Sequence, residues 1–343
     1  MKICFATHEG VALSKGGPYT KIKEVREKLL QKGITVDLFN LWDTKLVEYD
    51  VVHLVSSNFA VYNLARNMRV NNIRFIVEPV FFSTHSASFL KFFNKLDKIL
   101  RKVSRGIWFD YGFTRDICEW ALKVTPNTSD ELNIISKGLS IPKEKFKIIH
   151  NGVSERFLNA DPGLFEKEFG MKDFILCVGH IGPARKNVLA LIKALSKINH
   201  PAVFIGKIIP SAESEQILKQ AVDNKNLKII DVMENNSPTL ASAYAACNTF
   251  VLPSLYETPG IAALEAGLAG AKIVITPFGG TKDYFKDMAK YINPYSVDSI
   301  REGIEKTLNK QKDDKLKEYI KKNFLWDKIA DETINVYSEV LNE

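Results

Sequence analysis

Short apolar segments alternate with amphipathic segments along the first half of the chain. Near-continuous apolar runs are typical of parallel strands that are covered on both faces. Between the first two runs lies the segment 21–31, in which Ile22, Val25 and Leu29 recur at helical spacing. We therefore expect strands at 2–7, 34–40, 50–56, 74–82, 106–111 and 145–151.

The same alternation starts again in the second half, after a polar stretch that contains Pro162 and Gly163. Repeated strand-helix alternation predicts right-handed βαβ units in doubly wound parallel sheets. We expect an α/β chain with two Rossmann-like domains facing a cleft, and ligands beyond the carboxyl ends of the strands. The second set of strands is expected at 174–180, 202–207, 227–233, 249–255 and 272–278. The expected boundaries are 1–155 for the first domain, 156–172 for a linker, 173–324 for the second domain and 325–343 for a C-terminal helix that crosses back to the first.

Composition narrows the class of protein without naming a function. A chain of 343 residues with 45% hydrophobic and 25% charged residues suits two globular domains and excludes a disordered chain. No run approaches the ~20 apolar residues of a membrane span. The segment 1–10 is typical of a first strand rather than a secretion signal, so we expect a cytoplasmic protein. The four cysteines show no metal or disulfide spacing.

Positive charge is concentrated in the first half. Residues 1–150 hold 23 basic and 15 acidic side chains, a net charge of +8, whereas 151–343 hold 24 and 25. A basic half indicates an anionic partner, such as a phosphate, a nucleic acid or an acidic membrane surface.

Two glutamates stand eight positions apart across an expected strand-to-helix junction. Glu257 lies in the loop after the strand 249–255, and Glu265 lies on the Ala-rich helix that follows. Both can point into one cleft, where carboxylates accept hydrogen bonds from sugar hydroxyls. Backbone N–H groups at the start of that helix, near Gly260 and Ile261, suit an anion. The alternative is a surface loop glutamate and a solvated helical one.

Taken with its context, this pair resembles the E-x7-E motif of the retaining GT-B glycosyltransferases of family 4, the glycosyl transferases group 1. Other segments match the family in the same order along nearly the whole chain. They are Gly16-Gly17 after the first strand, 148–153 ending in Asn-Gly-Val, the phosphate-loop-like 178–187, the Gly-Gly turn at 278–280 and Phe324-Leu-Trp326.

The resemblance implies a role for each matched position. Glu265 would bind the ribose hydroxyls of a nucleotide-sugar donor, and Glu257 the hydroxyls of the transferred sugar. Arg185 and Lys186 would hold the diphosphate, whose charge grows in the transition state. Gly16 and Gly17 would let the backbone approach the diphosphate. The alternative for Arg185 and Lys186 is an ordinary solvated turn, and the alternative for Gly16 and Gly17 is a flexible turn. The donor would be a UDP- or GDP-sugar, with no metal and no cofactor.

Several positions depart from the family pattern. His180 stands where the family usually has Arg, and a neutral imidazole is a weaker phosphate clamp. Thr258 replaces a usual Gly after the first glutamate. Relatives often carry an acceptor-side His at the end of the fourth strand, where this chain offers Glu78 or, further on, His85.

The missing motifs weigh against other chemistries. The chain has no Asp-x-Asp, no G-x-G-x-x-G after the first strand, no P-loop motif and no G-x-S-x-G. We expect a retaining, metal-independent transfer of a sugar to an acceptor hydroxyl that is lipid-linked, glycan or protein-linked. The alternatives are a GT-B nucleotide-sugar epimerase or a basic nucleic-acid-binding protein. The latter is disfavoured because no recognition motif appears, so no nucleic acid is expected as a partner.

One segment of the basic half is strongly amphipathic. Residues 89–105 hold six basic, one acidic and eight large apolar side chains. A basic amphipathic helix can lie on an anionic membrane surface, which would make the protein a peripheral one. The alternative is a domain helix that packs its apolar face on the sheet.

Overall fold

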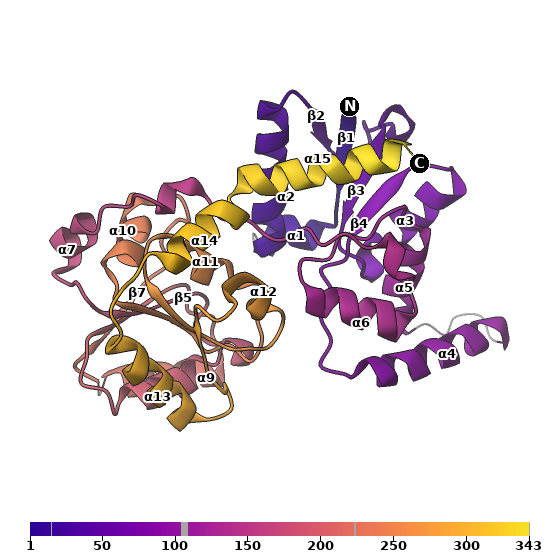
Figure 1. Cartoon of the computed structure of the whole chain (residues 1–343). Coiled ribbons are helices and arrows are strands. Elements are labelled where there is room, and N and C mark those ends of the chain that lie inside the picture. The colour runs from indigo at the N-terminus through magenta and orange to yellow at the C-terminus, as the bar shows by residue number, and fades with distance from the viewer. Residues whose placement is uncertain (15, 104–108, 223, 343) are drawn as a thin grey trace. The chain divides into compact units, whose positions relative to one another are not determined.

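The computed structural model describes residues 1–14, 16–103, 109–222 and 224–342. The chain divides into two compact units, one of 1–152 with 326–343 and one of 153–325. Both are α/β units with a parallel sheet, as the sequence predicts (Figure 1). The last helix belongs to the first unit, so the chain leaves that unit once and returns to it.

The first unit contains a four-stranded parallel sheet in the order β2-β1-β3-β4. Its central strands are buried on both faces because most of their side chains are apolar, as in Val51–Val55, where only His53 is polar. The strands are β1 (Lys2–Ala6), β2 (Thr35–Leu38), β3 (Val51–Val55) and β4 (Phe75–Glu78). The α-helices are α1 (Glu9–Ser14), α2 (Gly17–Gln31), α3 (Phe59–Val70), α4 (Ala87–Val103), α5 (Asp110–Trp120), α6 (Ser129–Leu139) and α15 (Trp326–Asn342).

Two expected strands of this unit are not strands in the structure. In the first, 106–111, residues 106–108 lie outside the described part of the chain, and Asp110 already begins α5. Phe113 and Ile117 of this helix lie four residues apart and face the core. The segment 145–151 makes a single bridge, Phe146 with Val124, which in turn bridges to β4. It therefore extends the sheet edge without forming a strand.

The second unit contains a six-stranded parallel sheet in the order β10-β9-β8-β5-β6-β7. The strands are β5 (Ile175–Val178), β6 (Ala202–Ile205), β7 (Leu227–Ile230), β8 (Thr249–Leu252), β9 (Lys272–Ile275) and β10 (Lys290–Tyr291). The α-helices are α7 (Gly163–Phe169), α8 (Val188–Leu195), α9 (Ala212–Val222), α10 (Pro238–Ala246), α11 (Ile261–Leu268), α12 (Thr281–Phe285), α13 (Val297–Leu308) and α14 (Lys315–Phe324).

The expected linker 156–172 is part of the second unit instead. Phe157 and Phe165 are fully buried in its core, and α7 packs against α10. Leu158, Phe169 and Met171 are partly buried against the same core, so apolar side chains spread along the segment fix it to the second unit.

The chain crosses between the units at two neighbouring points. The backbone N–H of Val153 donates to the carbonyl of Phe324 (2.7 Å). A side chain at Gly152 would overlap the ring of Trp326, since its Cβ would lie 2.4 Å from a ring carbon. The Asn-Gly-Val segment therefore uses glycine because Trp326 packs directly on the backbone there.

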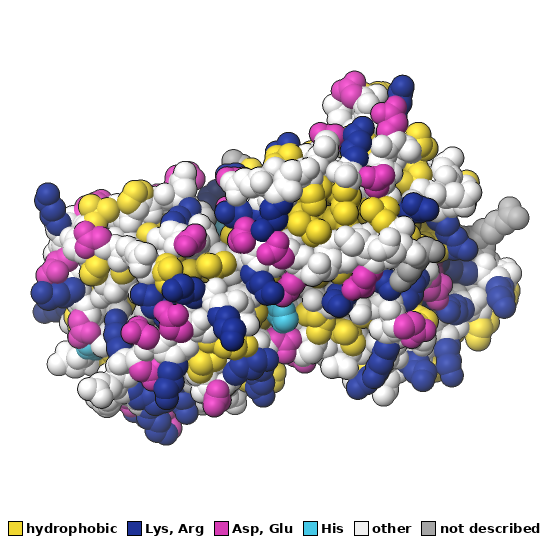
Figure 2. All heavy atoms as spheres, turned by 45° about the horizontal axis from the view of Figure 1, so that its top comes forward, with side chains coloured by type: hydrophobic (Ala, Val, Ile, Leu, Met, Phe, Trp, Pro, Cys, Tyr) yellow, Lys and Arg dark blue, Asp and Glu magenta, His cyan; other side chains and the backbone are white. Residues whose placement is uncertain are grey.

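Charged and apolar side chains share the surface. On the face drawn in Figure 2, Lys and Arg lie among Asp and Glu, and hydrophobic side chains are exposed between them. Single exposed hydrophobic residues are normal for a folded protein. In the described part of the chain, no helix has the length and apolarity that crossing a membrane requires.

Candidate functional site

The candidate site of the second unit lies at the carboxyl end of β8. The strand is buried and leads through a loop into α11, so Glu257 stands in that loop and Glu265 stands on the helix. Gly260 begins the helix with a φ of +83°, which a residue with a side chain rarely adopts. This strand-loop-helix arrangement is the one that the sequence predicts.

The Glu257 carboxylate is held by two cations from a different loop. Its Oε1 accepts hydrogen bonds from Lys186 Nζ (2.7 Å) and from the Arg185 guanidinium (3.2 Å). Arg185 also donates to the carbonyl of Tyr256 (3.1 Å) and lies over its ring. The sequence therefore predicted three site residues that the structure brings together from segments far apart along the chain.

The electrostatics of this cluster favour charged groups. Burial alone would raise the pKa of Glu257, but Lys186 and Arg185 outweigh that effect and hold the pKa below its usual range. The Glu257 side chain is only 9% exposed, whereas those of Lys186 and Arg185 are 19% and 39% exposed. The carboxylate is thus enclosed while both cations still reach solvent.

The backbone around Glu257 is fixed by the Gly-Gly turn. The N–H of Glu257 donates to the carbonyl of Phe278 (3.0 Å). Gly279 has a φ of +90°, and a Cβ there would lie 2.5 Å from the Glu257 carbonyl oxygen and 2.9 Å from its nitrogen. Only glycine allows the two loops to approach this closely.

The loop that carries the two cations is itself held in place. Residues Ala184–Lys186 form a short 3-10 helix, and Asn187 follows with a φ of +55°. The Asn187 amide donates to the carbonyls of Pro253 and Pro294. The loop is therefore tied to the carboxyl end of β8 by its own side chains.

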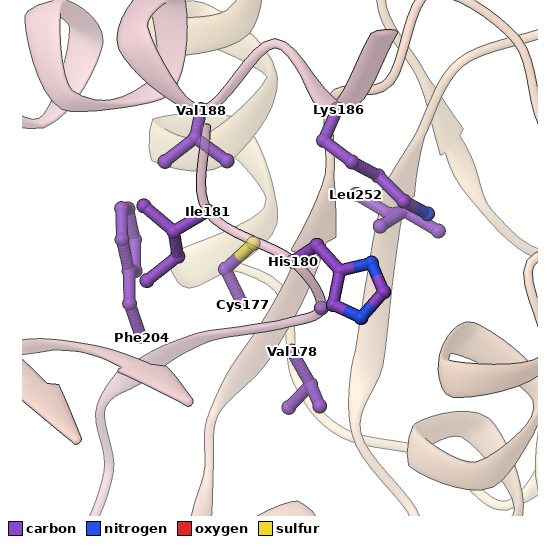
Figure 3. A pocket seen from close by; sticks show the side chains of 9 residues that line it. Cys177, Val178, His180, Ile181, Lys186, Val188, Phe204 and Leu252 are labelled. Atoms are coloured by element: carbon purple, nitrogen blue, oxygen red, sulfur yellow. The ribbon is translucent and has the colours of Figure 1, made fainter. Parts of the chain in front are cut away.

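His180 lies at the end of β5, close to this loop. Partial burial lowers the pKa of its imidazole, and Lys186, Lys207 and Arg185 lower it further. His180 and Lys186 line a cavity of about 10 Å³ together with Cys177, Ile181 and Phe204 (Figure 3). That volume suits one water molecule and not a sugar.

Glu265 is held separately from Glu257, by two partners that the sequence analysis missed. Tyr244 on α10 donates its hydroxyl to Oε2 (2.8 Å), and the Asn235 amide donates to Oε1 (3.0 Å). Glu265 is 5% exposed. Nothing in the local sequence marks either partner, because both come from segments without a motif.

Gly16 and Gly17 begin α2 in the first unit. Gly16 has an extended backbone with a φ of −83°, and the nearest atom to a Cβ built there, Ser14 Oγ, is 3.9 Å away. Neither backbone conformation nor local packing requires glycine at position 16.

The two acceptor-side candidates have very different surroundings. Glu78, at the end of β4, is 3% exposed and forms an ion pair with Lys21 (3.0 Å), while buried His53 lies 4.0 Å away. Burial lowers the pKa of His53 to about 3, so that ring is neutral. His85 is exposed and stacks on Phe89. Of the two, only His85 is open to a ligand, and the placement of Glu78 favours a structural ion pair.

The described residues contain no group of three or more His, Cys, Asp or Glu side chains that could hold a metal ion. The four cysteines are free and buried, and burial raises the pKa of each thiol. They behave as small core residues.

Comparison with known proteins relates much of the chain to known glycosyltransferases. Residues 165–323 match the family model for glycosyl transferases group 1. The chain is 29% identical over 255 residues to the uncharacterized glycosyltransferase MJ1607 of Methanocaldococcus jannaschii. The aligned region covers 66% of this chain and 62% of that relative. It is 26% identical over 194 residues to the O-antigen chain mannosyltransferase B of Escherichia coli, covering 51% and 48%. The chain thus covers less than two thirds of the length of either relative.

Solved structures show the same fold over the full length. Sucrose-phosphate synthase of Thermosynechococcus elongatus superposes with a TM-score of 0.76 at 17% identity and covers all of both chains. The Anabaena protein HepE in complex with UDP and glucose superposes with a TM-score of 0.71 at 16% identity, over 99% of this chain and 100% of that one. The chain therefore has the fold of the GT-B glycosyltransferases, and residues 165–323 of its second unit match the family model for glycosyl transferases group 1.

Proposed function

We propose that the protein is a retaining glycosyltransferase that moves a sugar from a nucleotide-diphosphate sugar to an acceptor hydroxyl without a metal. The observation that carries the proposal is the cluster of Glu257, Lys186 and Arg185 at the carboxyl end of β8. Two partly exposed cations beside an enclosed carboxylate suit a ligand that carries both phosphates and hydroxyls. The complexes of HepE with UDP and with UDP-glucose support a nucleotide-sugar donor.

In this proposal the two cations stabilise the leaving group. The bond from the sugar to the diphosphate breaks, and negative charge develops on the phosphate oxygens next to Lys186 and Arg185. Lysine carries three donors, so Lys186 can bind phosphate while it keeps Glu257 in place. Glu257 orients the pair and accepts hydrogen bonds from the sugar. The pKa of His180 is lowered, so we expect a neutral ring that contributes less to phosphate binding than Arg185 does.

Glu265 is proposed to bind the ribose. Tyr244 and Asn235 hold its carboxylate in place, and carboxylate oxygens accept hydrogen bonds from hydroxyls such as those of a ribose. Backbone N–H groups at the start of α11, near Gly260 and Ile261, would face the phosphates. A Cβ built at Gly16 meets no atom closer than 3.9 Å, so a ligand could lie beside that backbone.

The acceptor step is proposed to occur on the same face of the sugar. As the acceptor oxygen bonds to the anomeric carbon, the departing phosphate oxygen takes the acceptor's proton. This keeps the anomeric configuration and balances the proton without a separate base. Exposed His85 is the acceptor-side candidate that a ligand can reach.

The first test is a thermal-shift screen with UDP, GDP, ADP and their sugars. A ligand at a hundred times its Kd should stabilise the folded state by about 2.7 kcal/mol. The donor found in this way is then incubated with candidate acceptors, and the anomeric configuration of the product is measured by NMR. No stabilisation by any nucleotide contradicts the proposal. Conversion of the donor to an epimer, with no glycoside formed, supports an epimerase instead.

We also propose a peripheral position at an anionic membrane surface. The support is the net charge of +8 over residues 1–150. Attachment of this kind weakens as salt is raised. Sedimentation with phosphatidylglycerol vesicles at low and high salt tests it, and equal sedimentation at both salt concentrations contradicts it.

A further inference from the structure

Helix α4 is packed with its polar side inward. It lies outside α5 and α6 and packs against these two helices (Figure 1). The side chains that it buries are Leu90, Asn94 and Asp97, and the last two are polar. The sheet-packing alternative for this segment required the apolar face to be the buried one.

The inward side is fixed by specific polar contacts. Buried Arg115 on α5 donates to Asn94 (2.7 Å) and to Asp97 (2.8 Å). Asn94 donates in turn to the carbonyl of Leu139 on α6 (3.0 Å), and Arg101 pairs with Asp97 and Asp116. Rolling α4 about its axis would leave these charges buried without partners, which is costly. The helix is thus held with its other side toward solvent.

The outward side is apolar. Phe92 is 63% exposed, Ile99 is 60% exposed and Val103 is 82% exposed. At 3.6 residues per turn these three share one side of the helix, opposite Leu90, Asn94 and Asp97. Phe89 widens this surface and stacks on exposed His85. Three large apolar side chains exposed in one row on one helix differ from hydrophobic residues that are exposed singly.

A row of lysines runs beside the apolar row. Lys91, Lys95, Lys98 and Lys102 are all exposed and lie between the apolar side and the buried side. Lys98 pairs with Glu119 (3.2 Å), while no acidic side chain of α4 itself faces solvent, because its single acidic residue, Asp97, is buried. Two copies of this face brought together would place like charges side by side. A cationic row beside an apolar row complements an anionic membrane interface, with its charged headgroups above an apolar layer.

We propose that α4 lies flat in an anionic membrane interface and inserts Phe92, Ile99 and Val103 below the headgroups. The contact goes beyond electrostatic attachment, because apolar side chains leave water. It extends the proposed membrane attachment and is independent of the proposed sugar transfer, since none of these residues belongs to the candidate site. The segment 104–105 of the basic stretch lies outside the described residues and is not needed for the contact.

The test compares two single cysteines in the full-length chain. The first is Val103→Cys, at the last residue of α4, and the second is Val222→Cys, at the last residue of α9 in the second unit. The two valines have nearly equal exposure in the unsubstituted protein, 82% and 84%. All four native cysteines are buried, so an environment-sensitive label goes to the introduced thiol. With vesicles of phosphatidylglycerol and phosphatidylcholine, the label at 103 should shift to shorter wavelength, and the label at 222 should not. Vesicles of phosphatidylcholine alone should shift neither.

Two multiple variants separate charge from insertion. Lys91→Glu, Lys95→Glu and Lys102→Glu together should weaken vesicle binding by at least about a hundredfold, at about 1 kcal/mol per lysine. Phe92→Ser with Ile99→Ser keeps every lysine, and we expect more than a tenfold loss. Far-UV circular dichroism and nucleotide affinity should not change in either variant, which shows that the fold and the donor site are intact.

Several results would overturn the proposal. The absence of a shift at 103 at low salt excludes insertion, and so does an equal shift at 222. If the unsubstituted protein is a dimer in solution and Phe92→Ser with Ile99→Ser makes it a monomer, the face binds a second copy of the chain instead. Donor turnover is measured separately, so a failure here leaves the glycosyltransferase proposal in place.

Discussion

Replacing Gly279 by Ala should damage the site through the backbone of Glu257. Gly279 has a φ of +90°, where a residue with a side chain is less stable by about 1–2 kcal/mol. Its Cβ would also stand 2.5 Å from the Glu257 carbonyl oxygen and 2.9 Å from its nitrogen. Real Cβ atoms do not approach backbone atoms this closely, so one loop must move, at a further cost of about 1–3 kcal/mol.

The chain contains a matched control for this substitution. Gly270 has a φ of +91°, but a Cβ there meets no atom within 4 Å. Gly270→Ala therefore carries the backbone cost alone, about 1–2 kcal/mol. Gly279→Ala should reduce the free energy of unfolding by about 2–5 kcal/mol, the sum of the two costs. The difference between the two variants isolates the collision with Glu257.

The assays are urea unfolding and turnover of the donor found in the thermal-shift screen. Gly279→Ala should lose turnover because Glu257 no longer meets Lys186, whereas Gly270→Ala should keep it. Equal losses of stability in the two variants would refute the collision argument. A Gly279→Ala enzyme that is destabilised but fully active would refute the link between this turn and the site.

Three other measurements address the candidate site directly. Lys186→Ala should lower kcat by about a hundredfold at saturating donor, because the lost cation stabilises charge that forms in the transition state. The free energy of unfolding should change little. Steady-state kinetics and urea unfolding measure the two quantities, and a near-normal kcat would reject the role. Glu265→Ala should weaken nucleotide binding by about 1.5–3 kcal/mol, measured by calorimetry, and an unchanged affinity would remove it from the ribose site. The pKa of Glu257 is lowered in the folded state, so its pairing stabilises the protein fully above the ordinary glutamate pKa and is lost as the pH falls through the folded value. The stability difference between the unsubstituted protein and Glu257→Gln should therefore be constant near neutral pH and shrink in acid, and a difference that grows in acid would contradict this assignment.

The sheets could be predicted from the sequence because their central strands are mostly apolar on both faces. A run such as 249–255 has few alternatives once it is followed by a helix in a two-domain chain. The linker prediction was wrong because the polar residues of 156–172 hide apolar side chains that reach the core, among them the fully buried Phe157 and Phe165. The average polarity of a segment predicts its exposure to solvent only when most of its residues have the same exposure.

The candidate site could be predicted in part, and the limit is where hydrogen-bond partners come from. Glu257, Arg185 and Lys186 stand in segments that resemble a family motif, so their meeting was expected. Tyr244 and Asn235, which hold Glu265, stand in no motif. Partners of this kind are chosen by the packing of helices and loops, which a single sequence does not reveal.

The same limit explains helix α4. Periodicity predicted a helix with an apolar face, and the structure has that helix. Which face turns inward depends on Arg115, which binds Asn94 and Asp97 from another helix. An apolar face is usually the buried one, and here a buried polar network outweighs that tendency.

The two buried glutamates of the strand ends show how one kind of ion pair can serve two purposes. Glu78 pairs with Lys21, and the side chains are 3% and 5% exposed. Glu257 pairs with Lys186 and Arg185, which are 19% and 39% exposed. A fully enclosed pair cannot exchange its partner for a ligand without unfolding its surroundings, because each charge would be left buried and alone. Cations that reach solvent can gain a phosphate while they keep their carboxylate, and for that reason the exposure of the partners, more than the burial of the glutamate, distinguishes a candidate binding site from a structural ion pair.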